Sequence, residues 1–397
     1  MSASPSAGET ASAAPLRLLE GVRVLDLSRV LAGPWAAQLL ADYGADVIKV
    51  ERPDTGDDTR AWGPPWWDQE GDRVGVYFLC ANRGKRSVAI DIASPEGIAQ
   101  VKSLAMEADV LVENYKVGQL AKYGLDAASL QALNPRLIYC SVTGYGQDGP
   151  MAHKAGYDMA VQAEGGLMSI TGEPGGEPQK VGVAITDLMT GLYASTAILA
   201  ALNERHRTGR GRVIDAALFD VQVAMLANQA GNHLVGGLRP TRMGNAHPTI
   251  VPYQVLPTLD GHLVLAVGND GQFTRFCDAA GHPQLAQDVR FATNPARVQN
   301  RAALIPLISE WTRARSTEAW VDLLGPAAVP CAPILEVAEV MAHPHVAARG
   351  MVVPADPASG RPTLVAQPMR FDGQRPGSAL PPPALGSTPD ARWRSAD

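Results

Sequence analysis

The sequence predicts an α/β fold in which parallel strands alternate with helices. Short apolar segments typical of buried strands recur through the first part of the chain, and helical segments separate them. The chain has 397 residues, of which 46% are hydrophobic and 19% charged. This length suits two domains, and this composition excludes an intrinsically disordered protein.

The first elements form a strand–helix–strand unit. Residues 22–27 are apolar enough for a buried strand, and residues 35–43 are helical in character up to Gly44, which suits a helix C-terminus. Residues 47–51 form the next predicted strand. A helix that connects two strands in this way predicts that the strands are parallel.

The same alternation continues along the chain. The predicted strands are 87–92, 109–113 and 137–142, and the predicted helices are 95–107 and 127–133. A further helix at 188–207 ends in basic residues followed by Gly209, as the helix dipole favours. Its apolar run, 192–202, is too short to cross a membrane.

The second half of the chain predicts a smaller α/β unit. It contains a strand at 263–267 and helical segments at 273–280 and 301–324. The proline-rich residues 330–397 are expected to pack along the first domain as an extended segment, and the Ser/Ala-rich residues 1–15 to form an unstructured tail.

Charge and cysteine content narrow the classes of partner. The net charge of −6 gives no general attraction to nucleic acid or to anionic membranes, so an anionic ligand needs a local basic patch. The four cysteines are scattered without CxxC spacing, and the chain opens without a secretory signal. We therefore expect a cytoplasmic protein with no metal site, no membrane partner and reduced thiols.

A ligand crevice is expected at the carboxyl ends of the first two strands. Glu51 occupies the place of a ribose-binding acid, but Gly33 is followed directly by Pro34 and the dinucleotide glycine fingerprint is absent, which disfavours a dehydrogenase. Arg52 could meet an adenosine phosphate there. The basic cluster 82–86 is either a solvated surface or a phosphate contact beside this crevice.

Asp187 is the candidate reactive residue. It lies between an apolar run and the helix predicted to begin at residue 188, so it could simply cap that helix. The helix dipole is expected to lower its pKa and keep it ionised, and the glycine-rich loop 165–176 would face it. An ionised carboxylate in such a place could be a covalent nucleophile.

The segment 244–248 contains Gly244, Asn245 and His247. It could be a ligand-facing loop of the second unit. Equally, His247 could be a hydrogen-bonded structural residue, and both interpretations stay open at this point.

Taken together, these segments resemble the class III CoA-transferase family (CaiB/BaiF family) from about residue 16 to about residue 350. The motifs that carry the resemblance are long, beginning with VLDLSRVLAGP at 24–34 and GADVIKVERP at 44–53. The others are 82–87, 112–115, 134–139, 143–146, 165–172, 186–191 and 208–211.

The resemblance implies a Rossmann-like large domain with a smaller inserted α/β domain, and an interlocked homodimer. The large domain would comprise residues 16–225, the small domain 226–328, and the segment 329–397 would return to the large domain. No permanently bound cofactor and no metal are implied, because CoA and its acyl thioesters are the substrates.

The resemblance also implies the site residues. Asp187 would be the nucleophile, with a substrate loop at Gly165, Gly166, Gly244, Asn245 and His247. CoA-binding positions would be Val30, Leu31, Arg52, Ile90, Asn114, Tyr115 and Lys122, with Tyr157 and Asp158 near the thiol end of CoA. Ala93 stands where one branch has a lysine, so a phosphate contact of that branch is missing here.

The implied activity is transfer of CoA from an acyl-CoA to a carboxylic acid through a covalent aspartyl intermediate. The segment 114–118 resembles branches that use succinyl-CoA and dicarboxylates, whereas 244–248 lacks the consecutive glycines of the oxalate-using branch. An α-methylacyl-CoA racemase is one alternative, but Tyr157 stands where racemases have a histidine. A non-catalytic CoA-binding protein is another.

Overall fold

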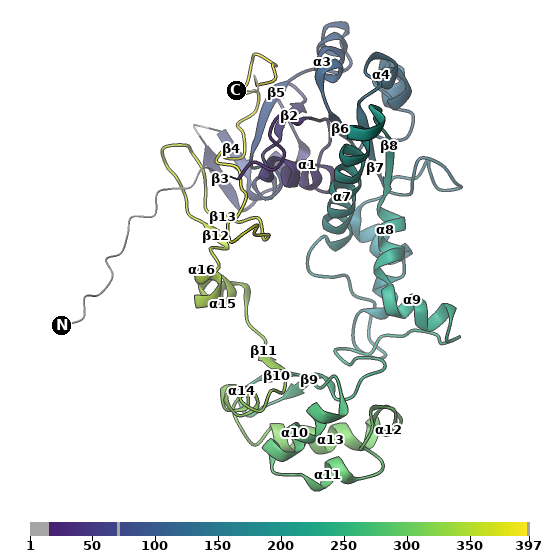
Figure 1. The fold of residues 1–397 in the computed structure, drawn as a ribbon, viewed down its shortest axis with the longest axis vertical. Helices are drawn as coiled ribbons and strands as arrows, with labels where there is room; N and C mark the ends of the chain where they lie inside the picture. Colours follow the sequence, from purple (N-terminus) through teal and green to yellow (C-terminus); the bar gives the residue numbers. More distant parts are fainter. Residues whose placement is uncertain (1–15, 70–71, 395–397) are drawn as a thin grey trace, which may run out of the picture. The chain divides into compact units, whose positions relative to one another are not determined.

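The computed structural model describes residues 16–69 and 72–394, so the predicted tail 1–15 lies outside the described residues. Contacts divide the chain into two compact units (Figure 1). Within the described residues, the large unit comprises residues up to 166, 181–230 and those from 345 on, and the small unit comprises 167–180 and 231–344.

A six-stranded parallel sheet forms the centre of the large unit, in the order β5-β2-β1-β6-β7-β8. The parallel α/β prediction is therefore confirmed. The strands are β1 (Arg23–Asp26), β2 (Asp46–Glu51), β5 (Lys85–Ala89), β6 (Val110–Glu113), β7 (Ile138–Thr143) and β8 (Val213–Ala217). Strand β8 was missed, because the charged residue Asp215 interrupts its apolar pattern.

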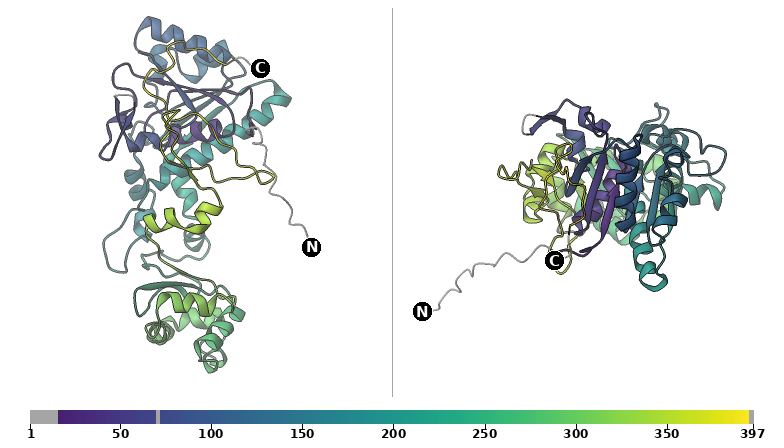
Figure 2. Two further views of the ribbon diagram at one scale, coloured as in Figure 1. Left: turned by 90° about the vertical axis from the view of Figure 1, so that its left-hand side faces the viewer. Right: turned by 90° about the horizontal axis from the view of Figure 1, so that it is seen from above.

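Helices cover both faces of this sheet (Figure 2). One face packs on α1 and α7 and the other on α3 and α4, and consecutive strand residues such as Val24 and Leu25 point to opposite faces. The main helices are α1 (Ala32–Asp42), α3 (Pro95–Glu107), α4 (Ala127–Leu133), α5 (Asp158–Glu164), α7 (Ile185–Thr208), α8 (Leu218–Met225) and α9 (Ala227–Leu234).

Short elements complete the large unit. They are α2 (Val76–Leu79), the 3-10 helices η1 (Asp58–Ala61) and η2 (Leu120–Tyr123), the hairpin β3 (Trp66–Gln69) and β4 (Asp72–Gly75), and the pair β12 (Val352–Val353) and β13 (Leu364–Val365). The C-terminal segment hydrogen-bonds along β5, where Thr388 N donates to Ser87 O at 2.9 Å. Helix α16 (Pro344–Ala348) begins at the boundary between the two units.

Helix α7 is longer than the sequence predicted. It begins at Ile185, has 24 residues and ends at Thr208, and it is capped by Gly209, whose φ of +69° suits glycine. In the described part of the chain it is the one helix long and apolar enough to cross a membrane, so the expectation that it is too short was wrong. One face of α7 packs on α1 and the sheet, as in the core helix of a globular domain.

The small unit has its own sheet and core. Its antiparallel strands β9 (Tyr253–Pro257), β10 (His262–Ala266) and β11 (Cys331–Pro333) pair in the order β11-β10-β9. Its helices are α6 (Leu167–Ile170), α10 (Asp270–Ala280), α11 (Gln284–Gln287), α12 (Asn294–Gln299), α13 (Arg301–Thr312), α14 (Thr317–Leu324) and α15 (Val337–Ala342). The helical segment expected at 301–324 is two helices, because Ser316 caps α14.

The bounds of the two units differ from those expected. Residues 329–344, assigned from the sequence to the returning segment, belong to the small unit because β11 pairs with β10. Residues 167–180, assigned to the large domain, also belong to the small unit, where Gly244 N donates to Gly172 O at 2.9 Å.

Candidate active site

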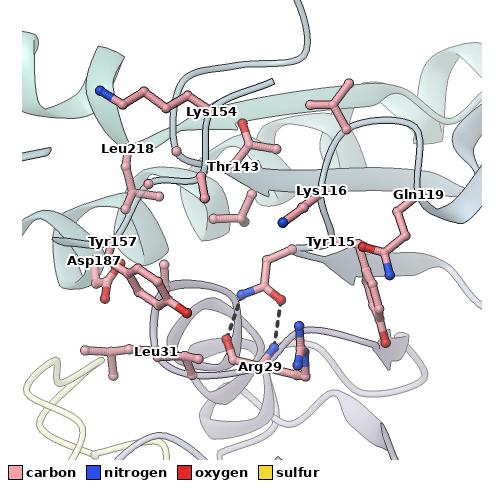
Figure 3. A pocket seen from close by; sticks show the side chains of 18 of the residues that line it. Arg29, Leu31, Tyr115, Lys116, Gln119, Thr143, Lys154, Tyr157, Asp187 and Leu218 are labelled. Carbon is pink, nitrogen blue, oxygen red and sulfur yellow. Dashed lines mark hydrogen bonds between the residues drawn. The ribbon is translucent and has the colours of Figure 1, made fainter. Parts of the chain in front are cut away.

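A cavity of about 240 Å³ opens in the large unit at the carboxyl ends of β1, β6 and β7. Ligands of open parallel sheets bind at this edge. The lining residues are 29–32, 114–117, 142–144 and 152–157, together with Asp58, Gln119, Asp187 and Leu218. Figure 3 shows Asp187 and Tyr157 at one end of this cavity and Arg29, Tyr115 and Gln119 toward the other.

Six of the predicted site residues line this one cavity, namely Val30, Leu31, Asn114, Tyr115, Tyr157 and Asp187. Arg52 and Ile90 line an adjoining cavity, which shares Arg29 and Tyr115 with the first. Lys122 is exposed on η2 and lines neither cavity. The structure therefore brings most of the predicted CoA-binding residues to one edge of the sheet.

The turn after β1 is held from the side by Asn114. Its Oδ1 accepts a hydrogen bond from Arg29 N at 2.8 Å, and its Nδ2 donates to Arg29 O at 2.6 Å (Figure 3). Val30, the next residue, has a φ of +71°, which is unusual for a β-branched residue. Asn114 thus fixes a strained turn that lines the cavity.

A buried cluster of charged residues also contacts this turn; its members are Asp26, Lys49, Asp57 and Lys85. Lys49 Nζ lies 2.9 Å from Asp57 Oδ2 and donates to Ser28 O at 2.7 Å, and Lys85 Nζ lies 2.8 Å from Asp26 Oδ2. Burial alone would raise the pKa of Asp57, but the Lys49 ammonium and the Thr59 amide lower it to about 2. The cluster is therefore a paired support for the turn.

The basic cluster 82–86 is not a free phosphate-binding patch. Lys85 is buried against Asp26, Arg83 is paired with Asp42, and Arg86 is paired with Asp46 at 2.6 Å. These residues belong to the strand β5 and to the loop before it, and their charges are matched by Asp26 and Asp46 of the sheet and by Asp42 of α1. The phosphate-contact interpretation of this cluster was wrong.

Glu51 is likewise engaged within the protein. Both its carboxylate oxygens accept hydrogen bonds from Arg60 at 2.7 Å, and Oε1 also accepts from Ser87 Oγ at 2.6 Å. Glu51 is 3% exposed and lines the adjoining cavity, but both its oxygens are already engaged by Arg60 and Ser87. The comparison with a ribose-binding acid therefore fails at this position.

Sequence reasoning missed Arg29, which lines both cavities. Its Nη1 donates to Asp58 Oδ2 at 2.8 Å, its guanidinium carbon lies 5.4 Å from the centre of the Tyr115 ring, and its Nε is buried with no partner among the described residues. Arg52 is paired with the same Asp58 carboxylate. The signal that could have found Arg29 is its place in the turn directly after β1.

Asp187 lies in the first turn of α7 but is not its N-cap, contrary to the sequence prediction. The N-cap residue is Ala184, and the capping carboxylate belongs to Asp158, whose Oδ1 accepts from Thr186 N at 2.8 Å and from Asp187 N at 3.2 Å. Asp158 therefore touches the backbone of the candidate nucleophile.

The pKa of Asp187 is also opposite to the expectation. Burial, together with the nearby negative charge of Asp158, raises it to about 7. Among the described residues no hydrogen-bond donor reaches the Asp187 carboxylate oxygens. An unpaired carboxylate with this pKa, at one end of a cavity, is a better nucleophile than an ordinary surface aspartate.

A second buried contact fixes the start of α7. Thr186 Oγ1 donates to Gln222 Oε1 at 2.7 Å, and both side chains are fully buried. Gly165 packs so closely on Gln222 that an added Cβ would lie 2.4 Å from Gln222 Cγ. Gly165 and the adjacent Gly166, whose φ is +85°, therefore serve packing and chain reversal here.

The predicted substrate-loop residues Gly244, Asn245 and His247 lie in the small unit, and Asn245 is exposed there. His247 Nδ1 accepts a hydrogen bond from Thr249 N at 3.2 Å, and its ring lies 5.3 Å from that of Tyr253. Burial lowers the pKa of His247, with a further contribution from Arg301. These contacts are those of a hydrogen-bonded structural histidine.

The described residues contain no group of three or more His, Cys, Asp or Glu side chains that could hold a metal ion. All four cysteines are free thiols.

Known proteins resemble this chain over nearly its full length. The model of CoA-transferase family III matches residues 19–388. A succinate–glutarate CoA-transferase of Agrobacterium fabrum is 51% identical over 90% of this chain and 92% of its own, and a human succinyl-CoA:glutarate CoA-transferase is 44% identical over 94% and 84%. A crystal structure of a CaiB/BaiF family protein from Brucella suis superposes with a TM-score of 0.82, at 51% identity over 93% of this chain and 96% of that one.

Proposed function

This chain belongs to CoA-transferase family III and is a CoA-transferase, and on that premise we propose that it exchanges CoA between dicarboxylic acids through a covalent intermediate on Asp187. The observation that carries the proposal is the Asp187 carboxylate itself. It lines the cavity at the carboxyl edge of the sheet, has no hydrogen-bond donor among the described residues, and has a pKa of about 7.

The first half of the proposed reaction transfers the acyl group to the enzyme. An Asp187 oxygen attacks the thioester carbonyl carbon, the C–S bond breaks, and the electron pair leaves on the CoA sulfur as a thiolate. The thiolate then attacks the Asp187 carbonyl carbon of the resulting anhydride. The donor acid leaves as a carboxylate, and CoA remains attached to Asp187 as a thioester.

The second half reverses these steps with the acceptor acid. Its carboxylate attacks the Asp187 thioester and releases the CoA thiolate, which then attacks the acceptor's carbonyl carbon. The products are the acceptor CoA ester and the free Asp187 carboxylate. Since the thioester energy is retained throughout, the cycle needs no nucleotide triphosphate.

We assign CoA to the two adjoining cavities of the large unit. Val30, Leu31, Asn114 and Tyr115 would contact its pantetheine part, and Arg52 and Ile90 its nucleotide part. Arg29, with an unpartnered buried Nε where the two cavities meet, is a donor for a phosphate oxygen. Lys122 would add a charge from η2, and Tyr157 would face the thiol end beside Asp187.

The substrate class rests on the relatives and on one segment. The two relatives above are named for succinate or succinyl-CoA and glutarate, and residues 114–118 have the form seen in succinyl-CoA-using branches. We propose a succinyl-CoA donor and a short dicarboxylic acceptor. Gly165 and Gly166 of the large unit, and separately Gly244, Asn245 and His247 of the small unit, remain proposed substrate-contacting residues.

We further propose a homodimer in the cytoplasm. The outer side of α7 exposes Leu192 and Tyr193, and α9 and the next residue expose Leu234 and Val235, which supports burial by a second copy. The free state of all four thiols supports a reducing compartment.

Isotope exchange tests this function. Labelled succinate mixed with enzyme and unlabelled succinyl-CoA, without a second acid, should pass its label into the CoA ester, because the enzyme-bound CoA thioester reacts with either acid. A non-catalytic CoA-binding protein gives no exchange. A racemase instead incorporates deuterium at the α-carbon of a branched acyl-CoA without exchanging the acid.

A further inference from the structure

Asp158 contacts the nucleophile through the backbone. Its Oδ1 accepts the amide hydrogens of Thr186 at 2.8 Å and of Asp187 at 3.2 Å, which are two of the N–H groups that the first turn of α7 leaves without intrahelical partners. The residue belongs to α5, far from α7 in sequence. A shift of Asp158 would therefore move the backbone of Asp187.

The second oxygen of Asp158 is fixed by Gln162. Gln162 Nε2 donates to Asp158 Oδ2 at 2.6 Å, and Gln162 Oε1 accepts from Val181 N at 2.9 Å. Gln162 is fully buried, and the use of both ends of its amide fixes its orientation. Asp158 thus accepts three hydrogen bonds and donates none, as an ionised carboxylate does.

Asp158 also determines the electrostatic surroundings of Asp187. It occupies amide hydrogens of the helix start that could otherwise stabilise the Asp187 carboxylate, and it places a negative charge beside that carboxylate. Tyr157 lines the same cavity as Asp187, and Tyr77 of α2 interacts with its charge. The other titratable residues that line this cavity are Arg29, Asp58, Tyr115, Lys116, His153 and Lys154. Burial and the charges of Asp187, Cys80 and Asp158 raise the pKa of Tyr77 to about 12, so Tyr77 is neutral and adds no further negative charge beside Asp187.

We propose that Asp158 is a positioning residue that holds Asp187 through the start of α7 and, by its charge, makes the Asp187 carboxylate a stronger nucleophile. The proposal rests on the function proposed for Asp187. When an Asp187 oxygen bonds to the acyl carbon and the C–S electron pair leaves on sulfur, Asp187 loses its charge. Repulsion between the two carboxylates is then relieved, while Asp158 itself exchanges neither a bond nor a proton.

The test is the pH profile of kcat/KM in the Asp158→Asn variant, with succinyl-CoA and glutarate between pH 5 and 9. The asparagine oxygen still accepts the two amide hydrogens, but the charge is gone. We expect the midpoint of the acidic limb to fall by about one pH unit and the plateau to fall about tenfold, because a less basic carboxylate is a weaker nucleophile. A lower plateau with an unmoved midpoint would show a purely structural role and overturn the proposal.

A matched control and a second variant make the result specific. Asp126→Asn removes the same charge at the N-cap of α4, where Asp126 accepts from Ser129, and should leave the profile unchanged. In Asp158→Asn the new amide meets Gln162 Nε2, so two donors face each other. The double variant Asp158→Asn/Gln162→Glu restores an acceptor and a charge, and should recover the melting temperature and shift the midpoint back upward.

If Asp158→Asn folds poorly, the double variant still tests the proposal. If it melts like the wild type and its midpoint equals that of Asp158→Asn, charge near Asp187 does not govern the profile and the proposal fails. Detection of a covalent adduct on Asp187 in the wild type distinguishes failure of the proposed function from failure of the role of Asp158. If no adduct forms, the proposed function fails. If an adduct forms but the pH profile of Asp158→Asn is unmoved, only the role of Asp158 fails.

Discussion

The large unit holds two groups of carboxylates, one fully buried and one half-buried, and they differ in what surrounds them. Beneath the turn after β1, Asp26 and Asp57 lie within 2.9 Å of lysine ammonium groups. At the start of α7, Asp187 faces a second carboxylate, Asp158, and has no cation beside it. The pKa of Asp57 is accordingly lowered to about 2, and that of Asp187 is raised to about 7.

This difference distinguishes the carboxylates that stabilise the fold from the carboxylate that we propose to react. In the paired cluster the pKa values of Asp26 and Asp57 are lowered, so these carboxylates are stabilised as charges and are poor nucleophiles, and loss of a partner damages the fold. The Asp187 carboxylate is destabilised as a charge, so bond formation that removes the charge is favoured. Residue type alone does not distinguish the two groups.

The largest expected effect is on activity at the unpaired site. Asp187→Asn removes the nucleophilic oxygen while keeping the size of the side chain, and should lower kcat by at least about 10⁴-fold. Circular dichroism should show the same fold, because Asp158 rather than Asp187 caps α7. A variant with kcat within tenfold of the wild type would contradict the account.

A large loss of stability is expected at the paired cluster. Lys49→Met leaves the buried carboxylates of Asp26 and Asp57 short of a counter-charge and removes the bond to Ser28 O. The free energy of unfolding should fall by about 3–5 kcal/mol, as measured by urea denaturation. An unchanged midpoint of denaturation would mean that the cluster does not support the turn.

In contrast to Lys49→Met, Asp187→Asn should raise the free energy of unfolding measured by urea denaturation. The folded pKa of about 7 exceeds the ordinary value of 3.8, so ionisation of Asp187 lowers the free energy of unfolding. This loss is absent below about pH 4, grows between pH 4 and pH 7, and is complete above about pH 7. The variant should therefore gain as much as about 4 kcal/mol over the wild type at pH 8 and nothing at pH 4. Equal stability of the two proteins at pH 8 would argue against the raised pKa.

The wild-type rate should follow the same titration. Only the ionised Asp187 attacks, so kcat/KM should fall about tenfold per pH unit below about pH 7 and be level above it. Initial rates between pH 5 and 9 measure this directly. A profile that stays level down to pH 5 would instead indicate the ordinary carboxylate pKa expected from the helix dipole.

The smallest expected effect is that of a substitution at Arg29 on the KM for succinyl-CoA. Arg29→Gln removes the charge at the meeting point of the two cavities, and should raise the KM for succinyl-CoA about tenfold with little change in kcat. Arg275→Gln, on the small unit, is a matched control, since Arg275 donates only to the carbonyls of Ala327 and Ala328. Equal KM values for the two variants would remove Arg29 from the CoA site.

Much of the fold could be predicted because buried parallel strands are short apolar runs. β1, β2, β6 and β7 have this pattern, and their strands were placed within a few residues. β5 was placed too late, because Lys85 and Arg86 look like surface residues until their buried partners Asp26 and Asp46 are known. β8 lies at the sheet edge and lacks a continuous apolar run.

The site could be predicted as a set of residues but not as an electrostatic arrangement. The motifs brought Asp187, Asn114 and Tyr157 to attention, and all three line the cavity. The predicted sign of the Asp187 pKa shift was wrong because the carboxylate is desolvated and because the capping group comes from Asp158, 29 residues earlier in the chain. Local sequence cannot show a contact between helices that far apart.

The most direct test of the central claim is covalent trapping at Asp187. Enzyme mixed with succinyl-CoA is treated with hydroxylamine or borohydride, digested, and analysed by mass spectrometry, with Asp187→Asn as the control. The account predicts a hydroxamate or a reduced side chain on the peptide that contains Asp187, in the wild type alone. An active enzyme with an unmodified Asp187, or a modification on another carboxylate, would contradict it.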